Sequence, residues 1–156
     1  MGYTHYWRFH KDKMESTEAL RQAFKGASDN VRFLFDRLPQ SQDILRGGLG
    51  EGEPIINETE VWFNGDEEKE EDHETFCITW KGEKGFDFCK TARKPYDLFV
   101  QLALLCFSDF FPSDVFTLSS DGDASEWQEA VNIYREHLYH IPNPFNKEEV
   151  FDHMTK

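Results

Sequence analysis

The chain contains 156 residues, 38% of them hydrophobic and 15% aromatic, and carries a formal net charge of −13. This length corresponds to one domain, and fifteen Phe residues are typical of a packed core rather than of a disordered chain. The acidity argues against a general nucleic-acid binder, because proteins that coat phosphates need an excess of Lys and Arg.

The apolar segments do not predict a membrane protein. The longest one, at residues 98–111, is interrupted by polar residues and is too short to span a bilayer. The first residues lack the apolar segment of a signal peptide. Cys77, Cys89 and Cys106 are widely spaced in apolar sequence, as expected for reduced thiols in a core. We therefore expect a cytoplasmic protein without membrane contact, and no motif indicates a metal or another cofactor.

Charge is distributed unevenly along the chain. Residues 1–50 carry +2 and residues 51–86 carry −9, whereas residues 87–97 carry +1 and residues 98–156 carry −7. The bases of the short third segment are Lys90, Arg93 and Lys94. A basic island between acidic blocks predicts a local anion site. The alternative is that these side chains pair with nearby carboxylates on the surface.

The first half of the chain predicts a strand, a helix and a long loop. The strand covers residues 2–9, with apolar side chains alternating along it. The helix is expected over residues 18–38, with Ser16 or Thr17 as its N-cap and a break near Gly26. Residues 40–57 are rich in glycine and predict a loop, long enough to be functional or disordered.

The second half predicts three strands, then a helix, a strand and a helix. The strands are expected at residues 60–64, 74–80 and 86–90, the last two joined as a hairpin. Pro95 opens a helix to about residue 110, whose apolar residues wrap most of its circumference, so it should be buried. A short strand at 115–119 and a helix capped by Ser125 complete the pattern.

This order of elements predicts an α+β fold in a single domain. We expect a mixed or mostly antiparallel sheet of about five strands, with three helices packed mainly on one face. The domain covers residues 1–140, and residues 141–156, which contain Pro142 and Pro144, are expected to form an extended C-terminal tail.

Several motifs occur together in this chain. They are Gly2-Tyr3-Thr4-His5-Tyr6-Trp7, Gly48-Leu49-Gly50-Glu51-Gly52-Glu53-Pro54, Phe63-Asn64-Gly65, His73-Glu74-Thr75-Phe76, Phe88-Cys89-Lys90-Thr91-Ala92-Arg93-Lys94-Pro95-Tyr96-Asp97, and Ser120-Asp121-Gly122 with Trp127. The set, which covers residues 1 to about 140, resembles a family of small uncharacterised proteins of bacteriophages and bacteria. The resemblance implies no activity. It implies a phage or bacterial cytosol and, for a phage, an accessory protein that acts on the host.

The junction between the strand at 86–90 and the following helix is the strongest candidate site. Backbone N–H groups and the helix dipole attract anions at a helix start. Arg93 offers a planar fork for phosphate, Lys94 a point charge and Thr91 a hydroxyl. The alternative is a capped helix start in which Arg93 pairs with an acidic neighbour.

The N-terminal strand is a second candidate. Tyr3, His5 and Trp7 share one face, on which a base could stack while His5 or Thr4 supplies a hydrogen bond. The alternative is that His5 packs against the core with its polar atoms satisfied.

Two further segments offer polar chemistry. His73-Glu74-Thr75-Phe76 resembles half of the motif of two-histidine phosphodiesterases, so His73 and, as a second histidine, His5 are the catalytic candidates. Ser120 and Asp121, in the turn after the last strand, could hold a ribose hydroxyl or a metal ion. The alternative for this turn is capping of the final helix.

The candidate ligand-binding residues are Thr4, His5, Tyr6, Trp7, Asn64, Thr75, Lys90, Thr91, Arg93, Lys94, Tyr96, Ser120 and Asp121. They favour non-catalytic binding of a small phosphorylated, nucleotide-like ligand, which in a phage would suit sequestration of a host immune nucleotide signal. One alternative is a phosphodiesterase or nucleotide-processing enzyme. Another is an acidic DNA mimic that binds a host protein through residues 66–74 and 109–129. Because small binding proteins can build a pocket between subunits, a homo-oligomer is also compatible with the first hypothesis.

Overall fold

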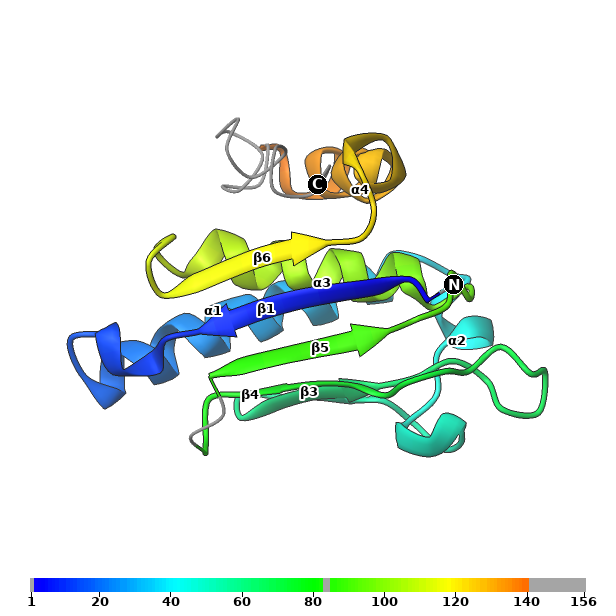
Figure 1. Ribbon diagram of the computed structural model, residues 1–156, viewed down its shortest axis with the longest axis horizontal. Helices are drawn as coiled ribbons and strands as arrows, with labels where there is room; N and C mark the ends of the chain where they lie inside the picture. The colour runs from blue at the N-terminus through cyan, green and yellow to red at the C-terminus, as the bar shows by residue number, and fades with distance from the viewer. Residues whose placement is uncertain (1, 83–84, 141–156) are drawn as a thin grey trace.

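Two three-stranded antiparallel sheets and four α-helices form the computed structural model, which describes residues 2–82 and 85–140 (Figure 1). The elements in chain order are β1 (Thr4–Phe9), α1 (Thr17–Asp36), α2 (Ser41–Ile44), β2 (Ile55–Ile56), β3 (Glu60–Phe63), β4 (Phe76–Thr79), β5 (Phe86–Lys90), α3 (Asp97–Phe110), β6 (Phe116–Ser120) and α4 (Gln128–Leu138). Short 3-10 helices lie at Lys11–Lys13, Gly48–Gly50 and Ala124–Trp127. The α+β class predicted from the sequence is confirmed, although the strands form two sheets instead of one and the helices number four. The predicted tail at 141–156 lies outside the described residues.

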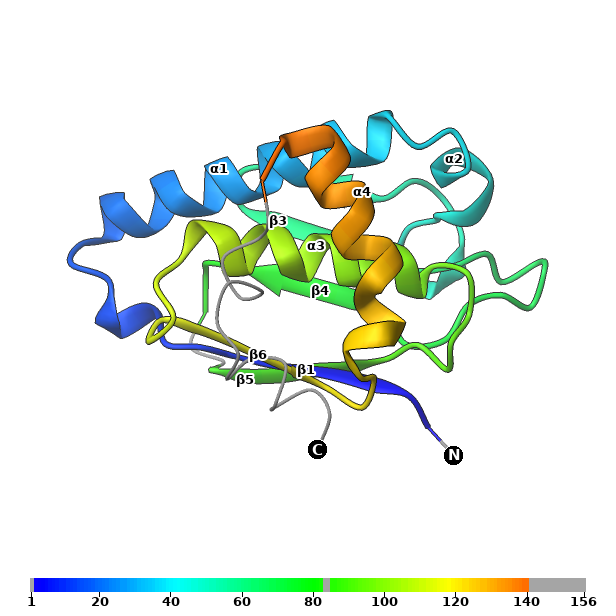
Figure 2. The same cartoon turned by 90° about the horizontal axis from the view of Figure 1, so that it is seen from above.

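The first sheet has the strand order β5-β1-β6, with β1 in the centre and both pairs antiparallel. Figure 2 shows the helices on one side of this sheet, and no described helix or strand covers its other side. The central strand follows the alternation expected from its sequence. His5, Trp7 and Phe9 are buried toward the helices, whereas Arg8 is exposed on the open face.

The second sheet has the order β2-β3-β4, and the hairpin predicted between β4 and β5 is wrong. β4 pairs with β3, and β5 pairs with β1 in the first sheet. The segment between β4 and β5 therefore carries the chain from one sheet to the other. The glycines and charged residues of this segment indicate that the chain changes direction. They do not indicate which strands β4 and β5 pair with.

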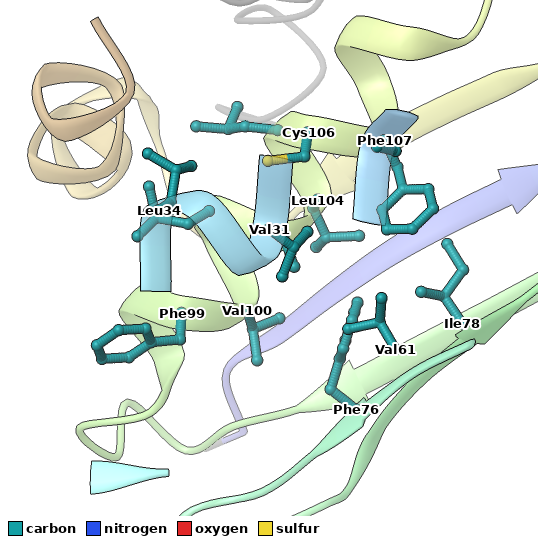
Figure 3. Close-up of a cluster of buried hydrophobic side chains, with 14 of the residues drawn as sticks. Val31, Leu34, Val61, Phe76, Ile78, Phe99, Val100, Leu104, Cys106 and Phe107 are labelled. Atoms are coloured by element: carbon teal, nitrogen blue, oxygen red, sulfur yellow. The ribbon is translucent and has the colours of Figure 1, made fainter. Parts of the chain in front are cut away.

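Helix α3 lies between α1 and the two sheets and forms the centre of the core (Figures 2 and 3). Its residues 99–108 are all buried, and the rings of Phe99 and Phe107 pack edge-on or tilted against Phe35 and Phe24 of α1. Figure 3 shows Val61, Phe76 and Ile78 of the second sheet pointing into the same cluster. The prediction of a buried helix after Pro95 is confirmed.

Helix α1 is continuous, so the predicted break near Gly26 is wrong. A Cβ atom at Gly26 would lie 2.4 Å from the Phe110 ring, so the glycine permits close packing of the two helices. The N-cap prediction is confirmed for Ser16, whose hydroxyl accepts a hydrogen bond from the Ala19 N–H at 3.0 Å. At the start of the 3-10 helix before α4, Asp123 and not Ser125 is the capping residue.

Two other local expectations are corrected. The predicted loop at 40–57 contains α2, a 3-10 turn and β2. Of the three cysteines, Cys89 and Cys106 are buried, and burial raises the pKa of both thiols. Cys77 is exposed, because it lies on the outward side of β4.

Among the described helices, none has the length and apolar content needed to cross a membrane.

Shortening a buried side chain of α3 should test whether this helix is the centre of the hydrophobic core. Leu104 is completely buried, so Leu104→Ala should lower the free energy of unfolding by about 2 to 5 kcal/mol through lost burial and a residual cavity. Leu98→Ala is the matched control, since Leu98 on the same helix is only partly buried and should cost clearly less. Urea denaturation of both variants provides the comparison, and equal losses would contradict the assignment of α3 as the core.

Candidate functional site

Several of the sequence-predicted residues meet at one end of the first sheet, where β1 begins and β5 and β6 end. The Thr91 N–H donates to the Tyr3 carbonyl at 3.0 Å, which ties the end of β5 to the start of β1. On the other side, the Asp121 N–H donates to the Thr4 carbonyl at 2.9 Å, and the Thr4 N–H donates to the Asp121 carboxylate at 3.0 Å. The antiparallel pairing thus brings Thr4, Thr91 and Asp121 together from distant parts of the sequence.

His5 is fully buried at the centre of a polar network. Its Nε2 lies 2.7 Å from Oδ1 of Asp97, and its Nδ1 lies 2.7 Å from the Ser120 hydroxyl. Because an ionised carboxylate only accepts, Nε2 donates to Asp97. The Ser120 oxygen in turn accepts the Gly122 N–H at 2.9 Å. This arrangement confirms the interpretation of His5 as a core histidine with satisfied polar atoms.

The Asp97 carboxylate collects donors from three parts of the fold. Besides His5 of β1, it accepts the Thr91 hydroxyl at 2.5 Å and the Gln101 amide at 2.9 Å. Its side chain is only 13% exposed, so these bonds replace most of its water. Asp97 therefore connects the start of α3 to the first sheet.

The order hydroxyl, imidazole, carboxylate in this network is the order used for general-base activation of a serine. Access to it is closed. Ser120 is 6% exposed, and the Trp127 ring packs edge-on against His5 with centroids 5.1 Å apart. A Cβ at Gly122 would lie 2.1 Å from the Tyr3 hydroxyl, which shows how closely Tyr3 covers this turn. In this conformation the network joins elements of the fold, and a substrate does not reach its hydroxyl.

Arg93 and Lys94, two bases of the island predicted at the start of α3, contact different partners. Arg93 forms an ion pair with Glu126 at 3.0 Å, and its guanidinium lies 4.0 Å from the centre of the Tyr3 ring. Lys94 donates to the Glu70 carbonyl at 3.0 Å. This ion pair agrees with the alternative given in the sequence analysis, in which Arg93 pairs with an acidic neighbour. It is well exposed and so contributes little to stability.

The backbone of this segment is strained. Ala92 and Arg93 adopt the left-handed conformation, with φ of 52° and 55°, although neither is glycine. Each such residue costs roughly 1 kcal/mol. The turn delivers Asp97 to His5 and places Tyr96, which is buried and donates its hydroxyl to the Glu74 carbonyl at 2.6 Å. The strain is thus offset by buried hydrogen bonds that the turn makes possible.

The open face of the first sheet carries an aromatic cluster, formed by Tyr6, Phe86 and Phe88 and called here the aromatic face. Tyr6 on β1 is directly opposite Phe88 on β5 in the strand register. The ring centroids of Tyr6 and Phe86 are 6.4 Å apart with planes 24° from parallel, and those of Phe86 and Phe88 are 6.2 Å apart. Phe86 and Phe88 are each 41% exposed, which is a large exposure for phenylalanine. This side of the sheet therefore offers two exposed rings to solvent, with the half-buried ring of Tyr6 beside them.

Charged groups surround the aromatic face. The Arg8 guanidinium lies 4.9 Å from the centre of the Phe86 ring, and the Lys90 ammonium lies 5.9 Å from that of Phe88. At the end next to β6, the Asp121 carboxylate accepts the Tyr6 hydroxyl at 3.1 Å. Partial burial and this bond raise the pKa of Tyr6. The face thus combines two cations, a carboxylate and three rings.

The face of β1 on which the sequence predicted base stacking is turned to the interior. Trp7 and Tyr3 are 3% and 2% exposed and belong to the interior, so neither can stack on a ligand base in this conformation. Phe86 and Phe88 were not predicted as site residues. The available signal was the alternation on β5, where aromatic and basic side chains flank positions that point inward.

Asn64, Thr75 and His73 form a separate cluster. The Asn64 amide donates to the His73 carbonyl at 3.0 Å and to the Thr75 hydroxyl at 3.1 Å, and its oxygen accepts the His73 N–H at 3.1 Å. Asn64 therefore holds the ends of the acidic turn together. His73 is exposed whereas His5 is fully buried, so the two candidate catalytic rings do not share an open site.

A cavity of about 660 Å³ lies elsewhere, between the C-terminal end of α1, α2 and β2, and contains none of the predicted site residues. Within residues 2–82 and 85–140, no three His, Cys, Asp or Glu side chains are arranged to hold a metal ion. No known protein-family model matches the chain, and no curated protein or solved structure is significantly similar to it.

The Asp97 network should contribute strongly to stability. Asp97→Ala leaves His5 Nε2 and the Thr91 hydroxyl without their acceptor and removes one of the two acceptors of Gln101, so we expect the free energy of unfolding to fall by about 3 kcal/mol. Glu126→Ala, which removes the exposed partner of Arg93, should change it by less than about 1 kcal/mol. Urea denaturation measures both, and a negligible loss in Asp97→Ala would show that the network is dispensable.

Proposed function

We propose that the protein binds a small phosphorylated, nucleotide-like ligand without turning it over, and that the base of this ligand stacks on the aromatic face. The observation that carries the proposal is the exposure of Phe86 and Phe88, beside the half-buried Tyr6, on a sheet face that no described element covers. A solvated sheet face ordinarily carries polar side chains. Neighbouring apolar rings on such a face are typical of a binding surface.

Base stacking suits these rings. Stacking of one base on an aromatic side chain contributes about 1 to 3 kcal/mol and tolerates different bases. The rings are carried by two paired strands, so little conformational entropy is lost on binding. Asp121 has lone pairs left after accepting from Tyr6 and Thr4, and these can accept an amino group at the edge of a base.

The cations beside the rings suit the phosphate of such a ligand. Arg8 and Lys90 lie on the same face and can move from their ring contacts toward an anion. In a chain with a net charge of −13, positive groups at this place provide local attraction for one or two phosphates. Arg93 and Lys94 are engaged elsewhere, so we assign them a smaller share than the sequence indicated.

The resemblance to phage and bacterial proteins suggests a biological context for this proposal. A phage protein that binds a nucleotide and leaves it intact would remove it from the host cytoplasm. Sequestration of a host immune nucleotide signal is the role that we propose on this basis.

Substitution of an exposed ring tests the site without disturbing the core. We expect Phe88→Ser to weaken the binding of the most tightly bound nucleotide about tenfold, which corresponds to the loss of one stacking contact. Native mass spectrometry with mono-, di- and cyclic nucleotides measures binding and shows whether the ligand mass stays intact. Tyr139→Ser is the matched control, because Tyr139 is an aromatic residue 89% exposed beyond the first sheet and its loss should have no effect. Unchanged affinity in Phe88→Ser would refute the assigned surface.

A second candidate function is hydrolysis of a phosphodiester or nucleotide with His5 as the general base. The contacts of His5 with Ser120 and Asp97 favour it, and it requires an opening of the Tyr3 and Trp127 cover. Mixing the protein with the same nucleotides and following product mass over time separates the two functions. We expect intact ligand. A fragment that accumulates with the wild-type protein and not with Ser120→Ala would establish the enzyme instead.

A further inference from the structure

We infer that the ligand of the aromatic face presents two consecutive bases joined by a phosphodiester, as in a dinucleotide or a short single strand. This inference rests on the proposed function and specifies the class of ligand. It follows from the number, spacing and strand positions of the exposed rings.

The aromatic face is wider than one base requires. Its centroids are separated by 6.2 Å from Phe86 to Phe88 and by 6.4 Å from Phe86 to Tyr6. A base in face-to-face contact with one of these rings leaves at least one other ring uncovered. A second base bound there removes apolar surface that a mononucleotide leaves in water.

The placement of the rings agrees with a general mode of single-strand recognition. In sheet modules that bind single-stranded RNA, two or three aromatic side chains on adjacent strands each stack one base. The strand that carries two of these rings has the pattern Lys/Arg-Gly-Phe/Tyr-Gly/Ala-Phe-Val-x-Phe/Tyr. This chain matches the first three positions and the fifth, and it has Asp87 at the fourth. This chain contains Lys84-Gly85-Phe86-Asp87-Phe88, and Tyr6 on the paired strand is opposite Phe88. The strand order β5-β1-β6 is this protein's own, so the agreement concerns the face and not the topology.

The charges limit the ligand to a short one. Arg8 and Lys90 can neutralise one or two phosphates, whereas the acidic chain repels a longer backbone that extends beyond the face. Affinity should therefore come mainly from stacking. For one neutralised phosphate of a single strand, the slope of log affinity against log salt is about −0.7.

The test compares adenylyl-adenosine (ApA) with AMP on the full-length protein by isothermal titration calorimetry. ApA carries two bases and one phosphodiester charge, whereas AMP carries one base and more negative charge. Stacking of two bases favours ApA and phosphate attraction favours AMP. We expect ApA to bind at least about tenfold more tightly, with a salt slope near −0.7.

Two variants locate the second base. Phe88→Ala should lower the affinity for ApA about tenfold and that for AMP by less than about threefold, because one base can still use the remaining rings. Thr117→Ala, on the neighbouring strand β6, is the control and should bind both ligands as the wild type does. Equal melting temperatures establish that the variants remain folded.

The outcomes separate the inference from its premise. AMP binding that equals or exceeds ApA binding, and that Phe88→Ala weakens, overturns the two-base ligand and leaves the proposed function standing. Binding of neither probe overturns both. A dimer in the native mass spectrum that is lost in Phe88→Ala, without nucleotide binding, would show instead that the face joins two copies of this chain.

Discussion

The enclosure of α3 is the constraint on which the rest of the structure depends. A helix that is apolar around most of its circumference is stable only when neighbours cover it on nearly every side. Helices α1 and α4 and the two sheets supply them, and the first sheet must turn one whole face inward to do so. The other face of this sheet is open to solvent. The side chains on that face come from the same three strands, because successive residues of a strand point to opposite faces.

The polar network around His5 solves a problem that this enclosure creates. The start of α3 enters the interior close to the beginning of β1, where polar backbone and side-chain groups must be satisfied without water. Asp97 accepts from β1, from the turn after β5 and from α3 itself. The strained residues Ala92 and Arg93 bring the chain into position for these bonds. A segment that resembles an anion cradle in sequence thus has a structural role in the described conformation.

Local patterns predicted the elements well, and they failed where distant segments decide. Residues 86–90 form β5 as predicted, and the helix after Pro95 and the Ser16 cap are present, because each depends on its own neighbourhood. The pairing of β5 with β1 is set by contacts between residues about eighty positions apart, which no local pattern encodes. The prediction of the candidate site depended on distant segments in the same way. Alternation in β1 separates Tyr6 from Trp7, but only the position of α3 determines which of them faces solvent.

The alternation in β1 also constrains how this protein can change over evolutionary time. His5 and Tyr6 are adjacent, and one belongs to the buried network while the other belongs to the aromatic face. Insertion or deletion of a single residue within β1 would exchange the two sets of side chains between the inside and the outside. Substitutions at odd-numbered positions from His5 to Phe9 therefore alter the buried side of the sheet, whereas those at Tyr6 and Arg8 alter only its open side. The open face of the sheet can diversify residue by residue while the length of this strand stays constant.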